Sequence, residues 1–184
     1  MTPDLIIDLF KYFAKFVPKS VLEKIFVQPT ATRLPGYNEI RADVQALPNT
    51  QVLPDFDTFV VSVNENFVSE RIKNSKEYAL FVEYGTFSIN HETTEGVKEW
   101  IAVSVTRNFS DNNNDSINEL IVMNKCFILL DAILQAMFAE QNELDFCDGS
   151  LATMPLEVVP VEPAAFYGHA GWCAKFKKVN TILI

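Results

Sequence analysis

Residues 116–144, SINELIVMNKCFILLDAILQAMFAEQNEL, form a long apolar stretch without proline or glycine. Apolar side chains recur along it at helical spacing, at Leu120, Met123, Phe127, Leu130, Leu134 and Met137. The stretch therefore predicts one long helix. Its middle, CFILL at 126–130, is apolar nearly all round, unlike a helix that has one solvated face. We expect a sheet to cover one side of this helix, and the first helix or a neighbouring subunit to cover another.

Three strand-like segments precede this helix, each with apolar residues at alternate positions. They are FVVSVNENF (59–67), EYALFVEYGTFSIN (77–90) and KEWIAVSVTRNF (98–109). Between the second and the third lies the polar run NHETTEG (90–96), whose composition suits a hairpin connection. The second and third strands are therefore predicted to pair in antiparallel orientation.

Two more strand-like segments follow the helix. PLEVVPVEP (155–163) is short and bounded by prolines, which favours an edge strand or an extended connector. The final stretch, 166–184, is expected to turn at Gly168 and Gly171 and then to alternate as a strand. This order of elements predicts an α+β fold, an antiparallel or mixed sheet with one long helix packed on it.

The N-terminus is predicted to be helical. Apolar residues recur at helical spacing from Leu5 to Val17, and Pro18 follows them, which indicates an amphipathic helix that ends there. Ser20 and Glu23, in SVLE, have the spacing of a capping box. A short second helix through about Phe26 is therefore expected.

Residues from about 28 to 55 hold four prolines, Pro29, Pro35, Pro48 and Pro54. Each proline removes a backbone donor and biases the preceding residue toward extended geometry, which predicts an irregular extended arm with one turn near Tyr37 to Val44. Long irregular segments are unusual in compact domains, so the arm is either a partner-binding element or a poorly ordered linker. We divide the chain into an N-terminal helix and arm, 1–55, and an α+β domain, 56–184.

The charge of the chain limits its function classes. The 184 residues carry a formal net charge of −9, which argues against a protein that grips nucleic acid by broad phosphate neutralisation. A local basic cluster, Lys175, Lys177 and Lys178, lies near the C-terminus. A solvated strand face is the favoured interpretation of such a short cluster, ahead of a nucleic-acid site.

The cysteines and the hydropathy indicate a soluble protein of a reducing compartment. Cys126, Cys147 and Cys173 are scattered and form no CxxC pair, so buried free thiols are expected and not a disulfide framework. Asp4, Asp8, Lys11 and Lys15 interrupt the apolar N-terminus, which argues against a signal peptide. We expect no apolar stretch long enough to span a bilayer.

A possible cation loop precedes the long helix. The run DNNND places oxygen ligands at alternate positions, Asp111, Asn113 and Asp115. A calcium loop of the EF-hand type would also require glycine where Ser116 stands and a bidentate glutamate where Val122 stands. We therefore interpret the run as a hydrated turn, with Ser116 as the N-cap of the helix and Glu119 as its capping-box partner.

Catalytic signatures are weak. His91 lies in the polar hairpin loop, and His169 stands four residues before Cys173, a spacing that raises the alternative of a cysteine nucleophile with a base. On an extended strand those two side chains need not meet, so a loop position for His169 and a core position for Cys173 are favoured. We assign no catalytic, cofactor-binding or metal-binding residue and expect the protein not to be an enzyme.

From about Glu77 to the end, two strands, a long helix and two strands follow one another, and the terminal GWCAKFKKV comes after the PLEVVPVEP connector. This order resembles the tail-terminator or neck-completion proteins of tailed bacteriophages. The proline-rich N-terminal part looks more like the stacked ring proteins of short-tailed, crAss-like phages, whose arms clasp neighbouring rings. The resemblance implies small α+β subunits that assemble into rings beneath the portal and carry no catalysis.

We accordingly expect a structural virion protein, a subunit of a homo-oligomeric ring of about six or twelve copies in a phage neck or tail. Its neighbours would be the portal or an adjacent ring or tail protein, contacted through residues 1–55, while DNA passes through the lumen without specific binding. Assembly would take place in the host cytoplasm, with no cofactor and no membrane. The alternatives are a cytosolic adaptor that forms no ring, and an enzyme that uses Cys173 and His169.

Overall fold

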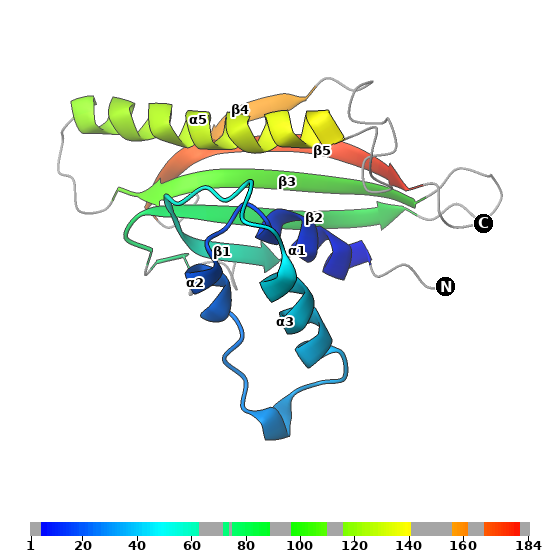
Figure 1. Cartoon of the computed structure of the whole chain (residues 1–184). Helices are drawn as coiled ribbons and strands as arrows, with labels where there is room; N and C mark the ends of the chain where they lie inside the picture. Colours follow the sequence, from blue (N-terminus) through cyan, green and yellow to red (C-terminus); the bar gives the residue numbers. More distant parts are fainter. Residues whose placement is uncertain are drawn as a thin grey trace.

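In the part of the chain that the structure describes, the helices α1, α2, α3 and α5 lie on one face of a mixed five-stranded sheet (Figure 1). The computed structural model describes residues 5–62, 72–73, 75–88, 97–109, 116–140, 156–161 and 168–180. Along the chain come the helices α1–α3, strands β1–β3, the long helix α5, and strands β4 and β5. This arrangement confirms the predicted α+β fold, with a long helix packed on a sheet and a helix at the N-terminus.

The sheet has the strand order β1-β2-β3-β5-β4. Its strands are β1 (Phe56–Ser62), β2 (Tyr78–Ser88), β3 (Val97–Asn108), β4 (Glu157–Val161) and β5 (His169–Asn180). β1 runs parallel to β2, whereas β2–β3, β3–β5 and β5–β4 are antiparallel. The sheet is therefore mixed, which was one of the two predicted forms.

Two predictions about individual strands are confirmed. β2 and β3 pair in antiparallel orientation, with Leu80 opposite Val105 and Val82 opposite Val103. β4 lies at the edge of the sheet, where Pro160 can be accommodated because an edge strand leaves half of its backbone groups outside the ladder. The expected hairpin loop at 90–96 lies outside the described residues.

The long helix α5 (Ser116–Glu140) confirms the helix predicted from Ser116 onward. It lies along the sheet over β3 and β5 (Figure 1). A salt bridge of 3.0 Å between Lys125 Nζ and Asp55 Oδ2 ties the middle of the helix to the start of β1. The predicted hydrated turn at 111–115 lies outside the described residues.

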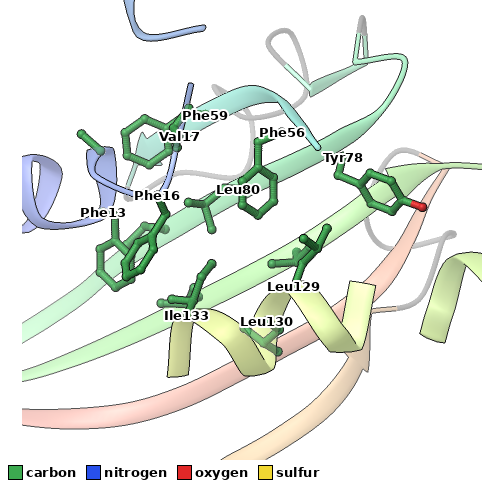
Figure 2. Packing of buried hydrophobic residues seen from close by; sticks show 14 of the residues in the cluster. Phe13, Phe16, Val17, Phe56, Phe59, Tyr78, Leu80, Leu129, Leu130 and Ile133 are labelled. Atoms are coloured by element: carbon green, nitrogen blue, oxygen red, sulfur yellow. The ribbon is translucent and has the colours of Figure 1, made fainter. Parts of the chain in front are cut away.

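The N-terminal helix α1 (Leu5–Ala14) shares the buried core of the sheet and α5. Phe13, Phe16 and Val17 are almost fully buried and belong to the same cluster as Leu80 and Ile133 (Figure 2). The cluster therefore takes residues from both sides of the boundary placed at residue 55. That division stays a prediction about domain organisation, while the packing joins the two parts.

The short helix α2 (Lys19–Glu23) differs from the expected capping box. Its N-cap is Pro18, whose carbonyl accepts hydrogen bonds from the backbone N–H groups of Val21 and Leu22. The helix thus begins one residue before Ser20, and Glu23 lies at its end, not in its first turn. The prediction of a Ser20–Glu23 box was wrong because the φ of proline, −56°, already suits a helix start.

The segment 28–55 is more ordered than an irregular arm with one turn. It contains the 3-10 helix η1 (Thr30–Thr32) and the ten-residue helix α3 (Tyr37–Ala46). α3 packs against α1 through Val44, which is fully buried, and through a 2.7 Å salt bridge between Lys11 Nζ and Asp43 Oδ2. The prolines stand outside α3, so they bound the helix and do not interrupt it.

Gly171 is not a turn residue, contrary to the expectation. It lies within β5, opposite Thr106 of β3, and a Cβ at this position would stand 2.0 Å from the Val105 carbonyl oxygen. Gly171 is therefore required by a close approach of two strands. Gly168, by contrast, has a φ of 79° and makes the predicted turn directly before the strand.

Candidate interaction surface

The helix α5 has two opposite apolar faces. The face that packs on the sheet holds its buried residues, Val122, Cys126, Leu129, Leu130, Ile133, Leu134 and Met137. On the other side, five large apolar side chains are exposed, Ile117, Leu120, Ile121, Phe127 and Ile128. At 100° per residue these five fall within one sector of roughly 120°, which we call the α5 face. Two of the five CFILL residues, Phe127 and Ile128, therefore point away from the core.

The α5 face is a candidate binding surface. Its five side chains are between 46% and 65% exposed. Single exposed hydrophobic residues are normal, but contiguous apolar patches of more than a few hundred Å² mark interaction sites. The face ends toward the C-terminus of the helix, where Asp131 and Gln135 occupy the outward positions. Within the face, the exposed Asn124 lies between the turn of Leu120 and Ile121 and the turn of Phe127 and Ile128. The face is therefore bounded toward the C-terminus and consists of two apolar clusters with one amide between them.

Aromatic contacts connect the α5 face to the sheet beneath it. The rings of Phe127 and Trp172 pack edge to face with 5.5 Å between their centroids. Trp172, on β5, donates a 3.0 Å hydrogen bond from Nε1 to the Met123 carbonyl oxygen on α5. This pair of contacts holds Phe127 in place although almost half of its surface is exposed.

A second apolar surface lies on the N-terminal segment. Val27 and Leu34 are 72% and 78% exposed, the highest values among the large apolar residues of the described chain. They flank η1, in the loop between α2 and α3, which projects away from the sheet on the β1 side (Figure 1). We call Val27 and Leu34 together with this loop, 27–36, the arm tip.

The arm tip is held in shape by polar and aromatic contacts. Arg33 donates from Nε to the Gln28 carbonyl oxygen at 3.0 Å and from Nη1 to Asn38 Oδ1 at 2.7 Å. Its guanidinium also lies 5.0 Å from the centre of the Tyr37 ring. Tyr37 in turn accepts a 3.2 Å hydrogen bond from the Gln28 backbone N–H and packs edge to face on Phe26.

The contacts of Arg33 and Tyr37 fix the shape of the arm tip before it binds a partner. Arg33 and Tyr37 connect the two ends of the loop, and the outward apolar side chains Val27 and Leu34 contribute nothing to that connection. These two side chains can therefore contact a partner without a change in the contacts that hold the loop. A loop that is already ordered also loses less conformational entropy when it binds.

The structure separates His169 and Cys173. Both lie on β5, and four residues along an extended strand span about 13 Å. His169 is fully buried, with Nδ1 3.3 Å from Thr106 Oγ1, and burial lowers its pKa to about 4. Burial raises the pKa of the Cys173 thiol, an effect that its hydrogen bond with Ser104 only partly opposes. The pair is not arranged as a nucleophile with its base, and the predicted loop position of His169 was wrong.

The remaining sequence candidates form no site within the described residues. Cys126 is buried as expected, and burial raises its pKa to about 12. Lys175 is exposed on β5, while the side chains of Lys177 and Lys178 lie outside the described part of the chain. His91 and the Asp111–Asp115 run also lie outside it. Within the residues that the structure describes, no group of three or more His, Cys, Asp or Glu side chains is placed to hold a metal ion.

The helix α5 is also apolar enough to cross a membrane by length and composition alone. An 18-residue window within it has a mean hydropathy of 1.7, which corrects the expectation that no such stretch exists. About 39% of this window is buried inside the protein, and core helices commonly meet the same criterion. The hydropathy of α5 is therefore only weak support for a membrane span.

Comparison of the chain with models of protein families, with curated proteins and with solved structures finds no match. The features of the structure that bear on function are therefore the α5 face and the arm tip. The sequence pointed to α5, because CFILL is apolar nearly all round, and it gave residues 28–55 as a partner-binding arm or a linker without singling out the arm tip. A signal was present there, since Val27 and Leu34 fit no helical or alternating pattern.

Proposed function

We propose that the protein is a structural subunit of a homo-oligomeric ring, of the kind found in the neck or tail of a tailed bacteriophage. The observation that carries the proposal is the α5 face, five large apolar side chains exposed on a helix whose opposite face forms the core. Covering such a face by association removes apolar surface from water, at roughly 25 cal/mol per Å².

Three further features agree with this role. The mixed sheet with one long helix on it matches the architecture that the phage resemblance implies. The net charge of −9 suits a lumen along which DNA slides, because a basic lining would bind phosphate. The buried state of Cys126, Cys173 and His169 leaves these three groups without the access that catalysis needs, which speaks against the alternative of an enzyme that uses Cys173 and His169.

In this proposal, copies of the chain join side by side around the channel. The portal or an adjacent ring or tail protein contacts the N-terminal segment, which projects from the sheet on the β1 side. The protein is assembled in the host cytoplasm and resides in the virion. It requires no cofactor.

The mass of the purified protein in solution tests the proposal. Light scattering coupled to size exclusion, over a hundredfold range of concentration, should show a multimer of defined copy number at the upper end, and electron microscopy should show annular particles. A cytosolic adaptor predicts a single copy or a small complex without annular particles. A protein that stays a single copy at every concentration would contradict a homo-oligomeric ring.

A further inference from the structure

The α5 face and the arm tip lie on different sides of the molecule. α5 lies over β3 and β5, whereas the arm tip projects on the β1 side, at the other end of the strand order (Figure 1). Within one chain neither surface covers the other, since Leu34 and Ile128 both remain more than half exposed. Two different surfaces on opposite sides allow head-to-tail association, which forms a ring when the rotation between neighbours closes.

We infer that the arm tip of one copy docks on the α5 face of a second copy of this chain. The inference rests on the proposed homo-oligomer and names the contact that would build it. Leu34 and Val27 would pack among the exposed α5 residues, beside Ile121 and Ile128, which lie one turn on either side of the exposed Asn124. It also changes the expectation for this part of the arm, which was to contact a different ring protein.

Charge favours this pairing. The arm tip, residues 27–36, contains one charged residue, Arg33, in a chain whose net charge is −9, and the exposed carboxylates Glu23 and Glu39 lie outside it on either side. On α5, the exposed Asp131 borders the face, while the single lysine of the helix, Lys125, is paired with Asp55. The charge of the arm tip and the charge at the edge of the α5 face are therefore of opposite sign, whereas two α5 faces that met each other would bring two Asp131 carboxylates together.

The shape and order of the arm tip also suit this role. Its loop is braced by Arg33 and Tyr37, so docking does not have to order it first. A loop that inserts one or two apolar side chains makes a small contact. In a closed ring every copy makes two such contacts, one through its arm and one through its α5 face, so the assembly is more stable than a single contact would be.

Two full-length variants and their mixture test the contact. Leu34→Asp disables the arm tip and keeps the α5 face, whereas Ile128→Asp disables the α5 face and keeps the arm tip. Each alone should be a single copy by light scattering. Mixed in equal amounts, they should form a species of two copies and nothing larger, because one intact arm tip and one intact α5 face remain. The milder Leu34→Ala should weaken self-association about tenfold.

Controls separate loss of the contact from loss of the fold. Ile6 is another exposed apolar residue, on α1, and Ile6→Asp should leave assembly unchanged. Each variant should keep the circular dichroism spectrum of the unaltered protein. Val27→Asp serves as a second arm variant should Leu34→Asp fail to fold.

The possible outcomes distinguish this contact from other uses of the same surfaces. Assembly that survives both arm substitutions would overturn the arm-to-helix contact and leave the proposed ring intact. Two single-copy variants that do not pair when mixed would overturn it as well. An unaltered protein that stays a single copy and floats with phosphatidylcholine vesicles would show that lipid covers the α5 face, and both proposals would fail.

Discussion

At the residue scale, Gly171 has a clear structural requirement. Its Cα lies so close to β3 that an added Cβ would meet the Val105 carbonyl oxygen at 2.0 Å and Thr106 Cα at 2.7 Å. Both are backbone atoms in the centre of the sheet, so no side chain can move aside to make room. Only glycine allows β3 and β5 to keep their spacing here.

Gly171→Ala should lower the free energy of unfolding by about 3 kcal/mol, because the two central strands must separate or shift. Gly36→Ala is the matched control. Gly36 has a φ of 84° but open space around its Cα, so alanine there should lower the free energy of unfolding by only about 1 kcal/mol. Urea denaturation of the two variants checks that Gly171→Ala loses more stability than Gly36→Ala. Equal losses would contradict the close approach at Gly171.

His169 should make the stability depend on pH between about 6.5 and 4. Burial lowers its pKa to about 4, against the opposing influence of a hydrogen bond with the Ile72 backbone and of the Asp57 charge. The unfolded chain therefore takes up a proton at His169 below about pH 6.5, before the folded chain does. The contribution of neutral His169 to the free energy of unfolding is therefore complete above about pH 6.5 and is lost as the pH falls toward 4.

The His169→Gln variant checks this pH dependence, because glutamine does not titrate. The free energy of unfolding of the variant, measured by urea denaturation from pH 7.5 to 4.5, should fall less steeply than that of the unaltered protein. Carboxylates titrate in both proteins, so only the difference between the two curves reports His169. Parallel curves would show that His169 has the same pKa in both states.

At the element scale, Glu140 joins the end of α5 to α1 and to the segment before β1. Its carboxylate accepts hydrogen bonds from Tyr12 OH at 2.8 Å and Gln51 Nε2 at 2.6 Å and forms a salt bridge with Lys15. Partial burial alone would raise the pKa of Glu140, but these contacts outweigh it and hold the pKa below its ordinary value. The cluster therefore fixes how the N-terminal helix sits against α5.

Glu140→Gln should lower the free energy of unfolding by about 1–2 kcal/mol near pH 7, because a charged acceptor of several hydrogen bonds is lost. Since the folded-state pKa of Glu140 is lowered, its contribution is present above about pH 4.3 and is lost below it. The difference between variant and unaltered protein should therefore shrink on acidification. Glu23→Gln, at an exposed carboxylate, should change stability by about 0.5 kcal/mol or less.

The elements that the sequence predicted well are those with strong periodicity. α5 and the strands β2, β3 and β5 follow from apolar spacing alone, and the edge position of β4 follows from its prolines. α3 was missed because its mostly polar sequence, YNEIRADVQA, buries only Val44 fully, so no apolar stripe marks it. The position of Gly171 depends on the distance between two strands far apart in the sequence, which no local pattern contains.

At the scale of the whole molecule, the candidate surface was only half predictable. CFILL indicated that α5 needs cover on two sides, but which residues face outward depends on the orientation that the sheet imposes on the helix. The arm tip depends on Arg33 and Tyr37 closing a loop that its prolines made look irregular. The parallel pairing of β1 with β2 also required the tertiary structure.

Association through these surfaces should make thermal stability depend on protein concentration, because assembly binds the folded chain and not the unfolded one. A tenfold increase in concentration raises the free energy of unfolding by at most about 1.4 kcal/mol for each contact. For a chain of this size, that increase raises Tm by about 3–5 °C. Leu34→Asp should unfold at the same Tm at every concentration, whereas Ile6→Asp should keep the concentration dependence. A Tm of the unaltered protein that does not change between 1 and 100 times the lowest concentration would mean that no association stabilises the fold. Scanning calorimetry over that range measures the effect without assuming a copy number.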